Sequence, residues 1–520
     1  MHTPSFTDRD IKQINEMGIT VKDVLSQIEM FKKGAPYVKL IRPCTVNDGI
    51  KVFDDEEQKK LKDIYNRYAP EMEIIKFVPA SGAASRMFRT LIKFNNRYRE
   101  INRYDIESTA KRGDKEAQYI LEFMDGIYKF PFIEDIDSVM SKNGLDMDAL
   151  IKKGEFKHII DFLITEKGLG YANLPKGLIK FHRYRDRART AFEEHLAESA
   201  GYIKDSHKQS CLHFTVSPEH MEKFHRLLDE IQEYYEKLFE MRLDVSFSIQ
   251  KKQTDTIAVD MDNRPFRLDD GSLLFRPSGH GALIENLNSI DKDIIFIKNI
   301  DNVVPDRLKH DIFLWKHILG GKLIQTQQKI FYYIKKLKTD NVDKVILNEA
   351  AEFIKTELSV LPELDNDLTL EEKRDIILEK LDRPLRVCGM VKNVGEPGGG
   401  PFWVEDNGSI SIQIVESAQV SPFSEEQQKI LASSTHFNPV DIACSIKNWQ
   451  GKPFDLKKYV DSRAVLISQK SKEGRDLKAL ELPGLWNGGM AYWNTVFVEV
   501  PLITFNPVKT VNDLLRKEHQ

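Results

Sequence analysis

The sequence of 520 residues is short of several features that mark specialised protein classes. It has only four cysteines, far apart and without a CxxC pair, which argues against a zinc ribbon or a disulfide framework. The longest apolar runs, such as DIIFI and FVEVPLITF, are far shorter than the roughly 20 residues that cross a membrane. The N-terminus, MHTPSFTDRD, lacks the basic start and apolar stretch of an export signal. We therefore expect a cytoplasmic protein without a membrane partner. The four cysteines are Cys44, Cys211, Cys388 and Cys444.

A large charge of one sign is also absent. Lysine and arginine number 76 against 80 aspartate and glutamate residues, which gives a formal net charge of −4. This balance argues against a protein that coats nucleic acid, and we expect no nucleic-acid partner. With 41% hydrophobic and 30% charged residues, the composition is that of a soluble globular protein. The length allows roughly three average domains, or one large α/β domain with insertions.

The order of apolar and polar segments predicts an α/β fold. Residues 1–70 are charged and read as helical, starting with a Thr-capped segment at TDRDIKQINEMGI. After residue 71, short apolar stretches (IIKFV, SCLHFTV, DVSFSIQ and DIIFI) alternate with helical segments, and strands resume at LRVCGMV. Residues 95–170 and 308–380 read as helical, and we expect them to be insertions. The alternation predicts a mixed, mainly parallel sheet with helices on both faces.

The segment VPASGAASRMF (78–88) has the composition of an anion-binding turn. It follows an apolar strand, and small residues such as Gly82 and Ser85 let the backbone approach an anion in front of a helix. Arg86 adds a guanidinium group with a geometry suited to phosphate. A tight turn without a ligand is the more common meaning of such a segment taken alone. It is not a Walker loop, because GxxxxGK[ST] is absent.

The basic segment LPKGLIKFHRYRDRAR (174–189) allows three interpretations. Its six lysines and arginines interleave with aromatic side chains, as in an RNA-binding patch. A solvated helix face is the more common meaning of such a run. The third interpretation uses only Pro175 and Lys176, and brings the lysine near the first turn to neutralise a triphosphate.

Two segments in the middle of the chain have a nucleotide-binding or metal-binding pattern. In FRPSGHGALIENL (275–287), Gly279 and Gly281 flank His280 and allow a flat ring or a ribose to lie against the backbone. In IIFIKNIDNVV (294–304), Asp301 follows an apolar strand, where ligands lie in open α/β sheets. A carboxylate there is a good Mg²⁺ ligand. A satisfied histidine and a capping aspartate are the plain alternatives.

Three later segments are weaker signals. The glycine cluster GEPGGGPFWV (395–404) either cradles phosphate or forms a flexible hairpin. Glu416 and Gln419, at a predicted strand end in IVESAQV, either bind sugar hydroxyls or cap the backbone. Lys509, in FNPVKTVNDLL (505–515), is either a site residue or a surface lysine that enters a terminal helix.

Taken in order, these segments resemble the UDP-sugar pyrophosphorylases (UTP–glucose-1-phosphate uridylyltransferase type) of the nucleotide-diphospho-sugar transferase superfamily. PASGAASRM is similar to the superfamily's opening loop, L-A-[GA]-G-x-G-[TS]-R-[ML], and LPKGLIKF to its P-K and apolar strand. FSIQ, RPSGHGA and NIDNVV resemble F-x-Q, P-P-G-H-G-D and N-I-D-N-L. GGGPF, VESAQVSP, FNPVD and TFNPVKTVNDLL resemble K-G-G-T, L-E-x-A-Q-V-P, F-N-T-N-N and R-F-x-P-V-K-T-x-x-D-L-L. The resemblance runs from about residue 74 to 516 and indicates a separate bacterial branch.

The resemblance implies a GT-A-like (Rossmann-like) fold and a nucleotidyltransferase. Its substrates would be a nucleoside triphosphate (NTP) and a sugar 1-phosphate, and its products a nucleotide-sugar, first of all a UDP-sugar, and pyrophosphate. The resemblance implies Mg²⁺ as cofactor, with Asp301 as its ligand. Residues 71–307 would be the nucleotide-binding half and 381–520 the sugar-binding half with the C-terminal segment. The other implied roles are catalytic for Arg86, Lys176 and Lys509, nucleotide-binding for Gly82, Ser85, Gln250, Gly279 and His280, and sugar-binding for Glu416, Gln419 and Asn438.

Departures from the family pattern keep two other hypotheses open. Ala84, Ala282 and Ser471 stand where the family has a glycine, an aspartate and the Q-x-E-T motif. These changes favour a non-catalytic sugar-nucleotide-binding protein on the same fold, whereas the retained Arg86, Asp301 and Lys509 favour the enzyme. A third hypothesis is an RNA-binding or scaffold protein that uses the basic segment at 176–189 and the helical insertions. The identity of the sugar and the base, and the oligomeric state, stay open.

Overall fold

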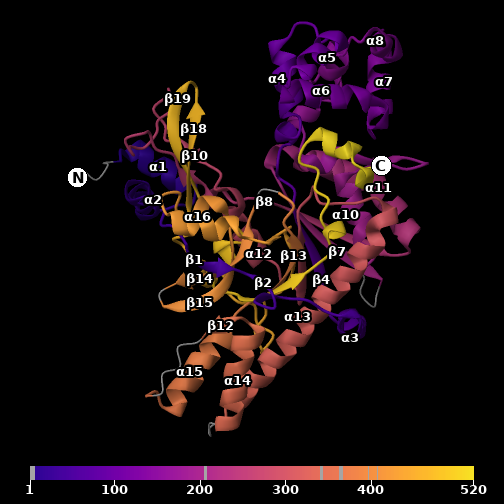
Figure 1. Ribbon diagram of the computed structural model, residues 1–520. Coiled ribbons are helices and arrows are strands. Elements are labelled where there is room, and N and C mark those ends of the chain that lie inside the picture. Colours follow the sequence, from indigo (N-terminus) through magenta and orange to yellow (C-terminus); the bar gives the residue numbers. More distant parts are fainter. Residues whose placement is uncertain (1–5, 204–207, 340–342, 362–366, 396–397, 407) are drawn as a thin grey trace. The chain divides into compact units, whose positions relative to one another are not determined.

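The computed structural model describes residues 6–203, 208–339, 343–361, 367–395, 398–406 and 408–520 (Figure 1). The chain divides into two units, each assembled from segments that are far apart in the sequence. The boundaries expected at residues 70, 307 and 380 separate a nucleotide-binding half from a sugar-binding half, and this functional division stays a prediction. The first unit comprises Met1–Phe77, Ser248–Ile297 and Lys316–Pro501, and the second comprises Val78–Phe247, Lys298–Trp315 and Leu502–Gln520.

A largely parallel sheet lies at the centre of the first unit. Its neighbouring strands follow the order β2, β3, β20, β13, β17, β11 and β4, and β17 runs antiparallel to β13. Strands β4, β11 and β13 are buried along almost their whole length, which is why their sequences are continuous apolar runs. The predicted α/β class with a mainly parallel sheet is confirmed. The strands are β2 (Thr45–Val46), β3 (Gly49–Lys51), β4 (Ile74–Pro79), β11 (Ile294–Lys298), β13 (Leu385–Lys392), β17 (Asp441–Ser445) and β20 (Asn494–Glu499).

A smaller antiparallel sheet in the same unit has the strand order β1, β14, β15 and β12. These strands are β1 (Lys39–Pro43), β14 (Gly400–Asp406), β15 (Ser409–Val415) and β12 (Val360–Leu361). Two-stranded pairs join β9 (Thr256–Ile257) to β10 (Phe275–Arg276) and β18 (Leu466–Lys472) to β19 (Arg475–Glu481), while β16 (His436–Phe437) pairs with the end of β13.

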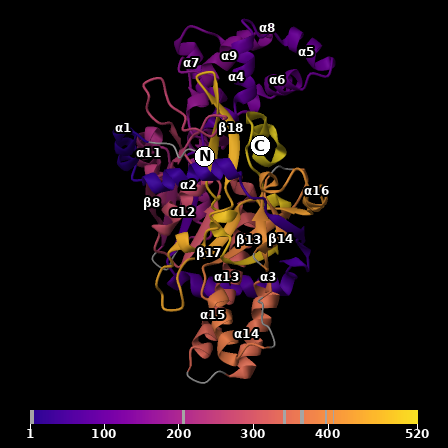
Figure 2. The same ribbon diagram turned by 90° about the vertical axis from the view of Figure 1, so that its left-hand side faces the viewer.

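The predicted helical insertion at 308–380 is largely helical where it is described. It contains α13 (Lys309–Leu337), α14 (Lys344–Glu357) and α15 (Leu370–Leu381), and α14 and α15 lie side by side (Figure 1 and Figure 2). Among the described residues, no helix combines the length and the apolar composition that a membrane crossing requires. The other helices of the first unit are α1 (Asp8–Glu16), α2 (Val21–Lys33), α3 (Asp55–Tyr68), α12 (Leu283–Asn288) and α16 (Glu425–Ala432).

The first 70 residues are only partly helical. Thr7 caps α1 as expected, because its hydroxyl accepts the Asp10 N–H while the Asp10 carboxylate accepts the Thr7 N–H. Residues 39–51, which were expected to be helical, instead form β1, β2 and β3. Asn47 and Gly49 there take left-handed φ values of 65° and 95°, which a helix cannot contain, and β1 pairs with the distant β14. The expected helical start is therefore present in α1, α2 and α3 but wrong for residues 39–51.

The second unit contains the other predicted insertion, 95–170, which is helical. Its helices share one apolar core with α10, β7 and the C-terminal residues Val508, Val511 and Leu514. The helices are α4 (Arg89–Arg97), α5 (Arg103–Lys111), α6 (Lys115–Asp125), α7 (Ile133–Lys142), α8 (Met147–Lys153) and α9 (Lys157–Ile164). They are followed by β5 (Lys180–Arg183), β6 (Ala188–Thr190), α10 (Ala191–Ser199), β7 (Gln209–Val216), α11 (Met221–Phe239) and β8 (Arg242–Ile249).

The basic segment at 174–189 is not a solvated helix face. Most of it forms the antiparallel hairpin of β5 and β6, and Phe181, His182 and Arg189 are buried. The Arg189 guanidinium binds Asp306 at 2.8 Å and lies 3.9 Å from the centre of the Tyr184 ring. At least one basic residue of this segment, Arg189, therefore forms an ion pair inside the second unit. The sequence pattern did not indicate this.

Candidate functional site

Asp301 lies at the centre of the candidate site, in the second unit, three residues after the end of β11. Lys176 Nζ lies 2.7 Å from Asp301 Oδ2, and Lys509 Nζ lies 3.2 Å from the same oxygen. The Lys176 ammonium also donates to the Val508 carbonyl at 2.8 Å. A single carboxylate oxygen therefore binds two lysines that are 333 residues apart in the sequence.

The three side chains differ in how far they are exposed. The side chains of Asp301 and Lys176 are 10% and 12% exposed, whereas that of Lys509 is 52% exposed. Lys509 is thus partly the surface lysine of the plain alternative, but its ammonium group is directed to Asp301. The terminal helix expected after it is a 3-10 turn, Val511–Leu515.

Burial and the two cations act on the Asp301 carboxyl in opposite directions. Burial raises its pKa, but Lys176 and Lys509 lower it by a larger amount, so the pKa lies below its usual range. Asp301 is therefore ionised at neutral pH. Two ammonium groups and one carboxylate leave this cluster with a net positive charge, which suits an anionic ligand.

The glycine-bearing turn lies against the chain around Lys176. The Ala84 N–H donates to the Leu174 carbonyl at 2.8 Å, and the Lys176 N–H donates to the Gly82 carbonyl at 3.2 Å. Because both hydrogen bonds are between backbone groups, they hold the turn next to Lys176 independently of side-chain conformation. The expected approach of Lys176 to the first turn is present in the structure, while its role toward a triphosphate stays a prediction.

The surface of this turn is open. Gly82, Ser85 and Arg86 are exposed, and a Cβ added at Gly82 would meet no atom within 4 Å. Ala84–Arg86 form a single 3-10 turn, and α4 begins at Arg89. In the described part of the chain, no ion pair joins Arg86 to Asp301. The chain itself therefore does not require glycine at position 82, and the space beside it is free of protein atoms.

Hydrogen bonds join the Asp301 loop to the C-terminal segment. The Val508 N–H donates to the Asp301 carbonyl at 3.0 Å, and the Asn506 N–H donates to Asn302 Oδ1 at 2.9 Å. Lys509 is the next residue after Val508. The hydrogen bond of Val508 therefore fixes the backbone of Lys509 beside Asp301. This pairing explains why a lysine near the end of the chain lies beside an aspartate near residue 300.

Beneath the loop, buried ionisable groups of α10 support the strand that leads to Asp301. Lys298 Nζ donates to Glu198 Oε2 at 2.8 Å, and both side chains are almost completely buried. The His195 ring nitrogen Nε2 lies 3.2 Å from the Ile300 carbonyl. Sequence reasoning missed this support, because charged residues in a helix ordinarily mark an exposed face. The only available signal was the density of ionisable residues in AFEEHLAES.

The predicted nucleoside-binding residues Gln250, Gly279 and His280 lie in the first unit. Gln250 follows β8 and is half-buried. Gly279 has a left-handed φ of 67°, and the exposed His280 ring lies 4.2 Å from the Trp486 ring, centre to centre. A Cβ added at Gly281 would come within 2.4 Å of Leu482 Cβ, so glycine at 281 serves packing. Their nucleoside-binding role stays a prediction.

The predicted sugar-binding residues are also in the first unit, and their described contacts are structural. The Glu416 N–H donates to Gln419 Oε1 at 2.9 Å, which is the capping alternative, and Glu416 Oε1 accepts from Asn487 Nδ2 at 3.1 Å. Burial, and then Glu481, raise the pKa of the Glu416 carboxyl. Asn438 is buried and accepts the Val440 N–H. Part of the glycine cluster at 395–404 lies outside the described residues.

The residues around Asp301 can hold a metal ion in only one way, together with a phosphate ligand. Across the described ranges, no group of three or more histidine, cysteine, aspartate or glutamate side chains could hold a metal. Asp301 is a single carboxylate, and Mg²⁺ commonly takes one or two carboxylates and completes its shell with water and substrate phosphates. With two lysines on the same oxygen, the site fits Mg²⁺ only together with a phosphate ligand.

Comparison with known proteins places nearly the whole chain in one family model. Residues 7–520 match the family described as "Domain of unknown function (DUF4301)". No curated protein matches the chain. Among solved structures, the uridine diphosphate N-acetylglucosamine pyrophosphorylase of Trypanosoma brucei is 12% identical, with 99% of this chain and 85% of that chain covered and a TM-score of 0.48. The UDP-glucose pyrophosphorylase of Leishmania major is 12% identical, with 98% and 79% covered and a TM-score of 0.46.

Proposed function

The chain belongs to the DUF4301 family, and we propose that it is a sugar-1-phosphate nucleotidyltransferase. It would form a nucleotide-sugar and pyrophosphate from an NTP and a sugar 1-phosphate. The observation that carries the proposal is the convergence of Lys176 Nζ and Lys509 Nζ on the buried Asp301 carboxylate, at 2.7 and 3.2 Å, beside the open turn at Gly82. The choice of UTP as the NTP comes from the motif resemblance alone.

Such a reaction brings two polyanions together, so neutralising their charge and aligning them supply most of the rate enhancement. The cluster of two lysines and Asp301 is net positive and is positioned by backbone hydrogen bonds rather than by long flexible side chains. Phosphate oxygens can replace the Asp301 oxygen as partners of the lysines, because a charge-assisted hydrogen bond to phosphate is as favourable as one to carboxylate. No general base is required, since the second pKa of a phosphate monoester is near 6.

The two lysines would have different tasks. Lys176 is almost buried and also donates to the Val508 carbonyl, so it holds the Asp301 loop and the C-terminal segment together. Lys509 is half-exposed and has no such second anchor in the described contacts, so it can leave Asp301 and follow a phosphate. We assign Lys509 to the phosphates at the reacting centre, and Lys176, with Arg86, to the triphosphate.

Mg²⁺ is part of the proposal as a companion of the phosphates. Asp301 would hold it, and the ion would supply positive charge to the phosphoryl oxygens. Asp301 is suited to this because its lowered pKa keeps it ionised. Gly82 and Ser85 would line the triphosphate, Gln250, Gly279 and His280 the nucleoside, and Glu416, Gln419 and Asn438 the sugar, as the motif resemblance implies.

The test is pyrophosphate release from four NTPs mixed with a panel of sugar 1-phosphates. The wild-type chain should release pyrophosphate with one combination, and Lys509→Ala should be slower by about 100-fold or more, because it removes a charge at the reacting phosphate. Lys517→Ala, an exposed lysine of the same segment, is the matched control and should keep the wild-type rate. A Lys509→Ala variant as fast as the control would contradict the assignment.

A non-catalytic sugar-nucleotide-binding protein is the alternative. Two observations favour it: Ala84 and Ala282, which replace a glycine and an aspartate of the resembled family, are fully buried and thus serve packing. Such a protein would bind an NTP or a nucleotide-sugar in calorimetry but release no pyrophosphate with any substrate pair. The same substrate panel therefore distinguishes the two functions.

A further inference from the structure

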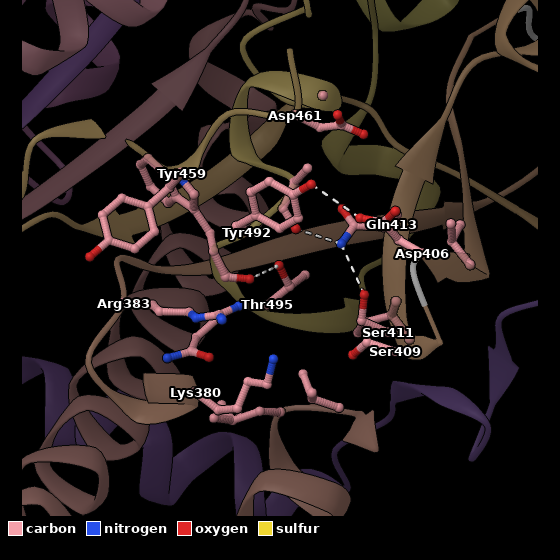
Figure 3. A pocket seen from close by; sticks show the side chains of 18 of the residues that line it. Lys380, Arg383, Asp406, Ser409, Ser411, Gln413, Tyr459, Asp461, Tyr492 and Thr495 are labelled. Carbon is pink, nitrogen blue, oxygen red and sulfur yellow. Dashed lines mark hydrogen bonds between the residues drawn. The ribbon is translucent and has the colours of Figure 1, made fainter. Parts of the chain in front are cut away.

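The first unit contains a cavity of about 790 Å³ that shares one lining residue, Gln419, with the residues assigned to the proposed reaction (Figure 3). Part of its wall is β15, and Arg383, Asn494 and Thr495 line it at the amino ends of β13 and β20. Asn438 follows β16, which pairs with the other end of β13 at Lys392. Of the predicted sugar-binding residues only Gln419 lines the cavity, so the cavity is separate from most of that set.

One side of the cavity is rich in hydroxyl and amide groups. Ser409, Ser411 and Gln413 alternate along β15 and therefore face the same way, and all three line the cavity. Figure 3 shows them near Asp406, whose carboxylate accepts the Tyr492 hydroxyl at 3.1 Å. Gln413 Nε2 donates to Ser411 Oγ at 3.2 Å and to the Ala491 carbonyl at 2.7 Å, so Gln413 positions Ser411. The hydroxyl groups of Ser409 and Ser411 match those of a sugar.

Two cations at the end of α15 also line the cavity. They are Lys380 and Arg383, which lie next to each other in the close view (Figure 3). Arg383 Nη2 donates to Glu379 Oε1 at 2.6 Å, but the Glu379 side chain is 67% exposed. An exposed pair of this kind contributes little stability. A phosphate group can therefore take the place of Glu379 on the guanidinium at small cost.

A buried cation behind the wall adds a reason to expect an anion. Arg386 is completely buried, and within the described ranges its hydrogen-bond partners are neutral: Thr495 Oγ1 at 2.9 Å, the Trp486 carbonyl at 2.6 Å and Gln413 Oε1 at 3.4 Å. A buried charge without an opposite charge is costly. Because Thr495 and Gln413 both line the cavity, the positive potential of Arg386 extends into it.

The carboxylates of the cavity do not cancel this potential. The lining contains four carboxylates, Glu379, Asp382, Asp406 and Asp461, and four cations, Lys338, Lys380, Arg383 and Lys458. Asp406 and Asp461 share Arg463, at 2.6 and 2.9 Å, and the buried Arg386 lies behind the wall. With these two arginines, six cations face four carboxylates. Glu379 is bound to Arg383. What remains is a cavity with a positive side, a polyhydroxyl-binding side and enough volume for a ligand of one or two sugar rings.

We infer that this cavity binds a phosphorylated sugar as a second site of the chain. The phosphate would lie on Lys380 and Arg383, and the sugar hydroxyls on Ser409 and Ser411, which Gln413 positions. The inference does not depend on the proposed nucleotidyltransferase activity, because no residue of the Asp301 cluster takes part in it.

Calorimetric titration of the full chain, without nucleotide, tests the inference. Glucose 6-phosphate should bind, whereas glucose and inorganic phosphate should each bind at least about tenfold more weakly, because each makes only one half of the contacts. Lys380→Gln should weaken glucose 6-phosphate binding by about tenfold. Lys373→Gln, on the same helix but outside the cavity lining, is the matched control and should bind as the wild type does.

Two further variants keep the test decisive. Ser411→Leu narrows the cavity without removing a charge and should also weaken binding, which covers the case in which Lys380→Gln folds poorly. Lys509→Ala should leave glucose 6-phosphate binding unchanged. The inference is overturned if no sugar phosphate binds up to about 10 mM, or if phosphate alone or glucose alone binds equally well. It is also overturned if Lys509→Ala, and not the cavity variants, removes binding.

Discussion

Two buried ionised side chains, Asp301 of the second unit and Arg386 of the first, are stabilised in opposite ways. Asp301, in the second unit, has two lysines within hydrogen-bond distance, and these outweigh the effect of burial on its pKa. Arg386, in the first unit, has only neutral partners where the structure is described, and burial lowers the pKa of its guanidinium. The comparison teaches that the Asp301 cluster carries its own counter-charges, whereas the surroundings of Arg386 leave room for an anion.

Removing the carboxylate of Asp301 should have the largest effect. Asp301→Ala leaves two ammonium groups beside each other without their partner, and we expect it to lower the free energy of unfolding by about 3 kcal/mol. Urea unfolding of the variant and of Asp513→Ala provides the comparison, because Asp513 is a carboxylate of the C-terminal segment that binds the backbone N–H groups of Lys509 and Thr510. If both variants lost the same free energy of unfolding, the ion pairs of Asp301 would contribute no more to stability than the backbone hydrogen bonds of Asp513.

The two glycine-bearing turns should respond differently to a methyl group. Gly281→Ala, in the first unit, places a Cβ 2.4 Å from Leu482 Cβ, and we expect a loss of about 2 kcal/mol. Gly82→Ala, in the second unit, meets no atom within 4 Å and should change stability by less than about 0.5 kcal/mol. Thermal unfolding of both variants measures the difference. A large loss in Gly82→Ala would mean that glycine 82 serves the fold and not a ligand.

Acid should weaken the second unit through His519. Burial, and then the neighbouring His182, lower the pKa of His519 to about 3 from 6.5, and the two rings are stacked. Because the unfolded chain binds this proton first, stability is complete above pH 6.5 and is lost as the pH falls toward 3. The loss is at most about 1.4 kcal/mol per pH unit.

His519→Phe keeps an aromatic ring at this position and removes the titration. Between pH 6.5 and 5 the variant should lose about 2 kcal/mol less than the wild type in the protection of second-unit amides from hydrogen exchange. Parallel pH curves for the two proteins would rule out His519 as the source.

The smallest effect is expected for Arg386. Arg386→Met replaces an unpaired buried charge by an apolar chain of similar length, so the hydrogen bonds that are lost are offset by the desolvation that is no longer needed. We expect a change of about 1 kcal/mol or less in urea unfolding. A loss as large as that of Asp301→Ala would erase the contrast between the two units.

Much of the fold could be predicted from the sequence, because apolar runs such as IIKFV and DIIFI are typical of fully buried strands. The strands at 39–51 could not, since partners such as β14 are far away in the sequence. The hairpin at 180–190 pairs neighbouring strands, but its many basic residues are typical of an exposed segment, and only the structure shows that Phe181, His182 and Arg189 are buried. The motif resemblance implied that Lys176, Asp301 and Lys509 are site residues, and the structure brings their side chains together. Neither the buried charges of α10 nor Arg386 could be predicted, because an ionisable residue is normally exposed and only tertiary packing shows the exception.

The most direct test of the central claim is calorimetric titration of UTP, with Mg²⁺, into the wild-type chain, Lys509→Ala and Lys517→Ala. If the Asp301 cluster holds the phosphates of a nucleotide, the wild type and Lys517→Ala bind UTP with the same affinity. Lys509→Ala should then bind at least about tenfold more weakly, since one charge-assisted contact is lost. Equal affinity of all three chains, or no binding of any nucleotide up to millimolar concentration, would contradict the account.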